Sequence, residues 1–182
     1  GLVGSEMCIR DRNWSIQQHD NGWIYVANNK GLLEFDGVEW NTYPIHNAKT
    51  RAVKVGHDGR IYIGGMEQFG YFTPNRLGGL EYTCLSDSLS PNVNVGVIWN
   101  ILLDGERVYF QSDRRFFYWE EGIAKKIDYS SEIYTSFILR NKLYITSAEG
   151  LLMLNGTEFI PVLGPLGIGA TVKVGGLLPH QD

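Results

Sequence analysis

Cysteine is nearly absent from this chain of 182 residues, which contains only Cys8 and Cys84. Two cysteines so far apart provide neither a disulfide framework nor the paired ligands of a zinc site. Long apolar runs are also missing, because no stretch of about 18 or more apolar residues occurs, and no segment is expected to span a bilayer. The net charge is −4 and no basic block stands out, so nucleic acid is not an expected partner.

Enzyme signatures are missing as well. The sequence has no G-x-S-x-G nucleophile elbow, no H-E-x-x-H metal helix and no phosphate-cradling G-x-x-x-x-G-K loop. Metal ligands need convergent spacing, and the histidines are scattered along the chain, at positions His19, His46, His57 and His180. We therefore expect no catalytic residue, no metal and no cofactor in this chain.

Glycine and tyrosine, in contrast, are abundant, with 22 and 10 copies. Tyrosine favours strands, and glycine supplies the positive φ angles that tight turns require. Hydrophobic residues make up 43% and charged residues 20% of the chain, which is typical of a globular domain. No sustained period of 3.6 residues indicates a helix, so we expect an all-β protein.

A repeated unit organises the chain from residue 13 onward. Each copy has a turn rich in Asp, Asn and Gly, such as Asp58-Gly59, followed by a short strand that contains a tyrosine. The tyrosines are 37, 47 and 35 residues apart, near the ~40–45 residues of a propeller blade, and they are Tyr25, Tyr62, Tyr109 and Tyr144. An apolar run before each turn predicts an inner strand, within residues 14–18, 52–55, 97–103 and 134–139. A further run predicts a last strand, within residues 38–43, 80–85, 123–127 and 158–162.

These units predict a β-propeller arc of four four-stranded antiparallel blades followed by the first strand of a fifth, part of a larger ring of about seven blades. We place the blades at about 13–46, 47–90, 91–130 and 131–165, with the next blade starting at 170–182. Residues 1–12 resemble adapter-derived sequence and are expected to be a non-native tail. Large aromatic groups should fill the space between blades, and those we expect there are Trp23, Phe35, Trp40, Phe72, Phe117, Trp119 and Phe159.

Any ligand is expected on the loops at one face, because loops on a rigid scaffold are where binding residues concentrate. In the usual blade order these loops join the second and third strands, and successive blades. The candidate ligand-binding residues are Asn28, Asn29, Lys30, Glu67, Gln68, Trp99, Asp113, Arg114, Arg115 and Glu149. The blade-to-blade connections add His46, Asn47, Lys49, Arg51, Asn92, Asn94, Asn100 and Glu132. Such a mixture of amide, charged and aromatic groups suits a small polyhydroxylated molecule such as a carbohydrate.

Two runs carry a resemblance to a known family. Residues 24–37, IYVANNKGLLEFDG, and residues 59–72, GRIYIGGMEQFGYF, resemble the sensor propellers of bacterial two-component regulators. These are the Bacteroidetes-type proteins in which regulator-propeller repeats precede a triple-tyrosine domain. The resemblance covers residues 13–182, and the third unit departs from it, with Arg115-Phe116 where the repeat expects a glycine.

The resemblance implies an extracytoplasmic, non-catalytic ligand-binding head on the periplasmic or extracellular face of a membrane-anchored protein. A β-sandwich, a transmembrane helix and a histidine kinase or DNA-binding output would follow in segments that this sequence lacks. Signal reception would then change how the propellers of a homodimer pack. Two alternatives remain open: a protein-binding scaffold, and part of a propeller enzyme such as a polysaccharide lyase or a glycosidase.

Overall fold

The structure, a computed structural model, describes residues 12–46 and 49–162. They form four four-stranded antiparallel sheets, in which consecutive strands are neighbours. The first sheet contains β1 (Asn13–Gln18), β2 (Ile24–Asn28), β3 (Gly31–Phe35) and β4 (Trp40–Tyr43). The second contains β5 (Thr50–Val55), β6 (Ile61–Gly65), β7 (Phe69–Pro74) and β8 (Leu80–Cys84).

The third sheet contains β9 (Ile98–Asp104), β10 (Arg107–Ser112), β11 (Phe116–Glu120) and β12 (Ile123–Ile127). The fourth contains β13 (Ile133–Leu139), β14 (Lys142–Ser147), β15 (Gly150–Asn155) and β16 (Glu158–Pro161). One short 3₁₀ turn, η1 (Ser86–Ser88), lies in the connection between β8 and β9. The expected fifth-blade strand at 170–182 and residues 1–11 of the expected tail lie outside the described residues.

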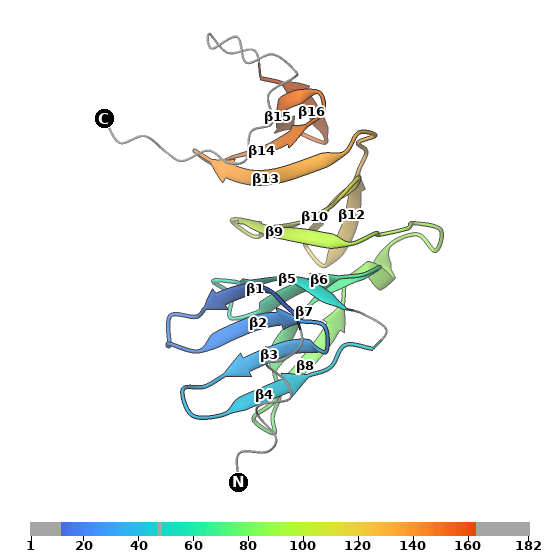
Figure 1. Ribbon diagram of the computed structural model, residues 1–182. Coiled ribbons are helices and arrows are strands. Elements are labelled where there is room, and N and C mark those ends of the chain that lie inside the picture. Colours follow the sequence, from blue (N-terminus) through green and yellow to red (C-terminus); the bar gives the residue numbers. More distant parts are fainter. Residues whose placement is uncertain (1–11, 47–48, 163–182) are drawn as a thin grey trace, which may run out of the picture.

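The sheets are the blades of an open propeller arc, as the repeat predicted. Figure 1 shows them following one another along the molecule, from β1–β4 at one end to β13–β16 at the other. The first strands approach one another, since β5 contacts both β1 and β9, and β9 contacts β13. We call the strands of each blade A to D in chain order, and the A strands are therefore the inner strands, nearest the axis of the arc.

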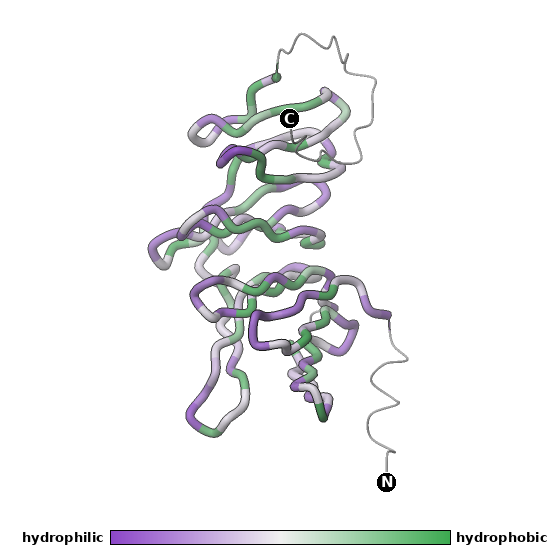
Figure 2. The backbone as a smooth tube through the Cα atoms, turned by 90° about the vertical axis from the view of Figure 1, so that its left-hand side faces the viewer, coloured by the Kyte–Doolittle hydropathy of each residue, from purple (hydrophilic) through white to green (hydrophobic). Residues whose placement is uncertain are grey.

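Apolar residues run along the strands and hydrophilic ones gather at the turns (Figure 2). Three buried hydrophobic clusters fill the spaces between consecutive blades. Tyr25 and Val53 belong to the cluster between blades 1 and 2, and Phe69 and Phe110, whose ring centroids are 4.3 Å apart, to the one between blades 2 and 3. Tyr109, Phe116 and Leu152 represent the third. Neighbouring blades thus bury the sheet faces that they turn toward each other, which one isolated four-stranded sheet could not do.

The expected aromatic packing is confirmed in part. Phe72 and Phe117 are fully buried, and Trp119 and Phe159 pack against the inter-blade clusters. Trp23 is exposed, so placing it between blades was wrong: it lies in the turn before β2, at the rim of the blade. Phe35 and Trp40 stack on each other within the first sheet, with centroids 4.9 Å apart.

Candidate functional site

All the predicted loops lie at one end of the blades. In an antiparallel meander the start of strand A, the B–C turn and the end of strand D fall at the same end of the sheet. We call this the B–C end, and the opposite end, which carries the A–B and C–D turns, the A–B end. Asn47, one of the expected connection residues, lies outside the described residues.

The B–C turns are tied to the connection that enters the next blade. Thr50 Oγ1 donates to the carbonyl oxygens of Asn28, at 2.6 Å, and Gly31, at 3.0 Å. The N–H of Glu67 donates to Gly96 O, and the N–H of Ile133 donates to Asp113 O, both at 2.8 Å. A hydrogen bond therefore joins the B–C turn to the next connection at each of three successive blade junctions, although the donor and acceptor groups differ from one junction to the next.

Two of the predicted residues, both in the B–C turn of blade 1, have structural tasks. Asn28 is fully buried; its Nδ2 donates to Asn13 Oδ1 at 2.7 Å, and its Oδ1 accepts from the N–H of Lys30 at 2.9 Å. Asn29 Oδ1 accepts from Trp14 Nε1 at 3.1 Å and from Arg51 Nη1 at 2.9 Å. Asn28 thus shapes the turn, whereas Asn29 holds two side chains of neighbouring A strands.

Glu67 and Gln68 line an open hollow of about 580 Å³ beside the β8–β9 connection. Glu67 has a positive φ of 60° and accepts from the N–H of Val95 at 3.2 Å. Gln68 Nε2 donates to His46 O at 2.9 Å. The structure therefore brings these two predicted residues together with the connection on either side of blade 2.

The remaining loop residues belong to blades 3 and 4. Asp113 and Arg114 are exposed, and Arg115 Nη1 donates to Asn94 Oδ1 at 3.1 Å. Glu149 accepts a hydrogen bond from Ser131 Oγ, which ties the B–C turn of blade 4 to the connection that precedes it. Among residues 12–46 and 49–162, Glu149 forms hydrogen bonds with Ser131 and Ser147 and none with the loop residues of blades 1 and 2.

Every A strand also contains a β-bulge at the same place, which the sequence did not reveal. In blade 1 the paired residues are Asn13 with Asn28 and Ser15 with Ala27, so the strand register skips Trp14 between them. The register skips in the same way in the other three sheets. The bulged residues of the four blades, which the strand register skips, are Trp14, Arg51, Trp99 and Tyr134. A bulge commonly re-aims a side chain next to a binding site.

The bulged residues are large and accessible. Trp14, Trp99 and Tyr134 are 39%, 47% and 39% exposed. Trp14 and Trp99 meet edge to face with centroids 6.0 Å apart, although their strands belong to blades 1 and 3. The Arg51 guanidinium of blade 2 lies 4.1 Å above the Trp14 ring. We call Trp14, Asn29, Arg51 and Trp99 the bulge cluster. Trp14 was not among the predicted site residues. Tyr134 is the residue of blade 4 that corresponds to Trp14.

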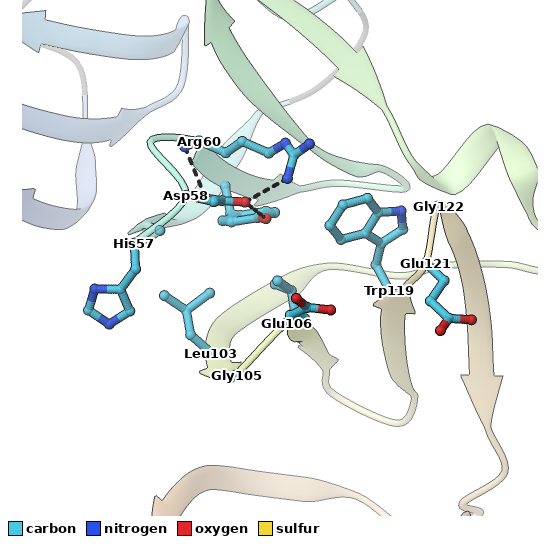
Figure 3. A pocket seen from close by; sticks show the side chains of 12 residues that line it. His57, Asp58, Arg60, Leu103, Gly105, Glu106, Trp119, Glu121 and Gly122 are labelled. Atoms are coloured by element: carbon cyan, nitrogen blue, oxygen red, sulfur yellow. Dashed lines mark hydrogen bonds and ion pairs between the residues drawn. The ribbon is translucent and has the colours of Figure 1, made fainter.

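A second hollow lies at the A–B end, between blades 2 and 3. It has a volume of about 470 Å³, and Figure 3 shows Asp58 and Arg60 on one side with Glu106, Trp119 and Glu121 on the other. Arg60 Nη1 and Asp58 Oδ2 form an ion pair of 2.6 Å. None of the predicted site residues lines this hollow, because we interpreted the Asp-Gly pairs as turns only.

The electrostatics of this hollow follow from its hydrogen bonds. Burial alone would raise the Asp58 pKa, but the Tyr62 hydroxyl, at 2.7 Å, and Arg60 donate to the carboxylate and hold its pKa below the usual value. Burial and the same bond to Asp58 raise the Tyr62 pKa. Among residues 12–46 and 49–162, no group of three or more His, Cys, Asp or Glu side chains could hold a metal ion.

No protein-family model matches the sequence. No curated protein matches it either. Within the described ranges, no helix has the length and apolarity that crossing a bilayer requires.

Solved structures do resemble the chain. The extracellular domain of a putative one-component system from B. thetaiotaomicron matches with a TM-score of 0.63 and 14% identity, over 85% of this chain and 22% of that chain. The extracellular domain of a putative hybrid two-component system from the same organism gives 0.60 and 17%, over 84% and 22%. A catalytically inactive virginiamycin B lyase from Staphylococcus aureus, with quinupristin, gives 0.67 and 12%, over 92% and 59%.

The chain spans less than two thirds of the length of each of these structures. At these identities the likeness is one of fold. The neighbours are propeller-like, and they include the extracellular domains of Bacteroides one-component and two-component systems, in agreement with the resemblance of the repeat pattern. The neighbours also include enzymes.

Proposed function

We propose that this chain is the ligand-receiving part of an extracytoplasmic sensor domain of a signal-transduction regulator, without catalysis of its own. The observation that carries the proposal is the row of bulged side chains, which projects large aromatic and cationic groups at the same place from four consecutive blades. Accessible side chains held in fixed positions suit ligand binding, whereas catalysis would require a pair of groups that transfer a proton. The extracellular domains among the fold neighbours support the same class.

The proposed ligand is a small molecule or a carbohydrate bound at the B–C end. The hydrogen bonds that link the B–C turns of blades 1 to 3 to the next blade restrain this end, so a ligand that touches several blades would favour one arrangement of the ring. In a homodimer of complete propellers, that preference would shift how the two rings pack. The proposed location is the periplasmic or extracellular face of a membrane. Segments other than the described residues would anchor the protein there.

The test is a ligand screen on the purified chain and on the complete protein that contains it. We expect retention on a glycan array, or a rise in melting temperature with one class of small molecule, because a ligand that binds only the folded state stabilises it. The same ligand should activate a reporter driven by the complete regulator. A ligand that binds without any reporter response would overturn the sensor assignment.

An enzyme is the second candidate, and the hollow of Figure 3 is the observation that favours it. Its lining includes the ionisable residues His57, Asp58, Glu106 and Glu121, and virginiamycin B lyases share the fold. Acid and base catalysis requires ionisable side chains within reach of a bound substrate. Incubation with quinupristin and with a panel of polysaccharides, followed by mass spectrometry, separates the two candidates. The sensor proposal expects unchanged substrates. Turnover that Glu106→Gln abolishes would overturn the sensor proposal in favour of the enzyme.

A further inference from the structure

The bulge cluster has an arrangement that suits one class of ligand. Its two indoles lie at an interplanar angle of 66° and form a corner. A flat aromatic ligand would stack on one ring face only. A sugar ring carries C–H groups on its face and along its edge, and these pack against the electron-rich faces of aromatic rings. The corner therefore favours a saccharide over a planar aromatic compound.

The polar groups of the cluster are donors. Arg51 Nη1 is used by Asn29 Oδ1 and by Thr50 O, each at 2.9 Å. In the described part of the chain, Arg51 Nε, Arg51 Nη2 and Asn29 Nδ2 donate no hydrogen bond, which leaves three donor groups for a ligand. Asn29 Oδ1 already accepts two hydrogen bonds. Such a site favours a ligand rich in acceptors.

The charge of the cluster points the same way. None of the ion pairs among residues 12–46 and 49–162 involves Arg51. Burial and the neighbouring positive charge of Arg12 lower the Arg51 pKa, and no carboxylate of the described residues forms an ion pair with this cation. A guanidinium without a carboxylate partner binds a planar carboxylate through two parallel hydrogen bonds better than it binds a hydroxyl group.

We infer that the bulge cluster is a binding site for a carboxylate-bearing saccharide, with the sugar ring in the corner of Trp14 and Trp99 and the carboxylate on Arg51. The inference rests on the proposed ligand-binding function and assigns to it a site and a charge. Asn29 positions both Trp14 and Arg51 through its Oδ1. The predicted residue Trp99 thus forms one wall of the site, and Trp14 in β1 forms the other.

The experiment compares three uronic-acid oligosaccharides, namely galacturonate, mannuronate and hyaluronan oligomers, with their carboxyl-reduced counterparts by isothermal titration calorimetry. We expect at least one acid form to bind about tenfold or more tighter than its reduced form, since one charge-assisted pair contributes about 1.4 kcal/mol or more. Arg51→Gln should remove that difference. Arg51→Lys should restore part of it, because lysine keeps the charge and loses the planar fork.

Trp99→Ala should weaken the binding of acid and reduced forms alike, and Trp99→Phe should weaken both less. The matched controls lie at the A–B end, where Trp23→Ala and Arg76→Gln should leave binding unchanged. Equal affinity for acid and reduced forms, no binding of any of the three acids, or binding insensitive to Trp99→Ala would overturn the inference. If one of these results is obtained but another ligand from the glycan array activates the reporter, the proposed sensor function stands and only the saccharide site is wrong. If no glycan on the array binds, both the site and the sensor proposal are wrong.

Discussion

Ile16 and Val53 occupy the same register position in consecutive A strands, yet their surroundings are opposite. Each is the second residue after the bulge, and each pairs with the middle of its B strand, Ile16 with Val26 and Val53 with Ile63. Ile16 is 63% exposed and Val53 is 3% exposed. The equivalent residues of blades 3 and 4, Ile101 and Ser136, are 3% and 4% exposed. The difference arises because blade 1 covers Val53, and no described blade precedes blade 1 to cover Ile16.

The first prediction uses this pair. Val53→Ala should lower the free energy of unfolding by about 2 kcal/mol, because it removes buried methyl groups from the cluster between blades 1 and 2. Ile16→Ala should change it by less than about 0.5 kcal/mol, as substitutions at exposed positions usually do. Urea denaturation of both variants measures the contrast. Equal losses would mean that another part of the protein covers Ile16.

The blade architecture could be predicted because each unit marks its own turns. Asp58-Gly59 precedes β6, and Asn75 to Gly79 separates β7 from β8, so the strands are bounded by residues with a mechanical reason to turn. Trp23 was misplaced because the sequence does not tell whether an aromatic group beside a turn points inward or along the rim. Packing between blades decides this, and packing is not local.

The candidate site was only partly predictable. The B–C turns were found, because their polar residues stand between two apolar runs. Asn28 was misinterpreted, since a polar loop residue resembles a ligand contact in sequence, whereas in the structure it is buried and shapes the turn. Arg51 and Trp99 were within the expected set, whereas Trp14 and Tyr134 were not. A bulge adds one residue to a strand without any signature in composition, so only the pairing of both strands shows that these four positions are equivalent.

Gly64 supports the second prediction. A Cβ atom at this position would lie 2.7 Å from Ile98 Cβ across the junction of blades 2 and 3. Gly64→Ala should therefore destabilise the fold by about 1–3 kcal/mol through overpacking. Gly79→Ala is the matched control, since its Cβ would meet nothing nearer than 3.6 Å and alanine restricts the unfolded chain. If both variants melt at the same temperature as the parent, blades 2 and 3 are packed less closely than described.

The third prediction concerns two ion pairs of different geometry. Arg107 Nη2 donates to both oxygens of Glu120, at 2.8 Å and 2.9 Å, and the guanidinium lies 4.9 Å from the Tyr118 ring centre. Lys126 and Asp128 form a pair in which the aspartate side chain is almost fully accessible. Glu120→Gln should cost up to about 1 kcal/mol at low salt and less at high salt, and Asp128→Asn should cost nothing measurable. Denaturation at two salt concentrations distinguishes them, and a larger loss for Asp128→Asn would contradict the assignment.

The fourth prediction follows from the hydroxyl of Tyr43, which donates to Glu34 Oε1 at 3.0 Å beside the cluster between blades 1 and 2. Burial, together with this hydrogen bond and the charge of Glu34, raises the pKa of Tyr43 from 10.0 to about 12. The raised pKa favours the neutral phenol in the folded state, so its contribution to stability is complete below pH 10 and is lost as the pH rises from 10 to about 12.

Ultraviolet titration of the phenolate in the parent and in Tyr43→Phe isolates this group, and the variant should lack one ionisation at the high-pH end. Glu34→Gln is the matched control. It removes the charge and keeps an acceptor, so the Tyr43 ionisation should move toward its ordinary pH while Tyr43 stays in place. Urea denaturation at pH 9 and near pH 11 should then show a smaller loss of stability for Tyr43→Phe than for the parent. An identical loss in both proteins would assign the alkaline instability to other groups.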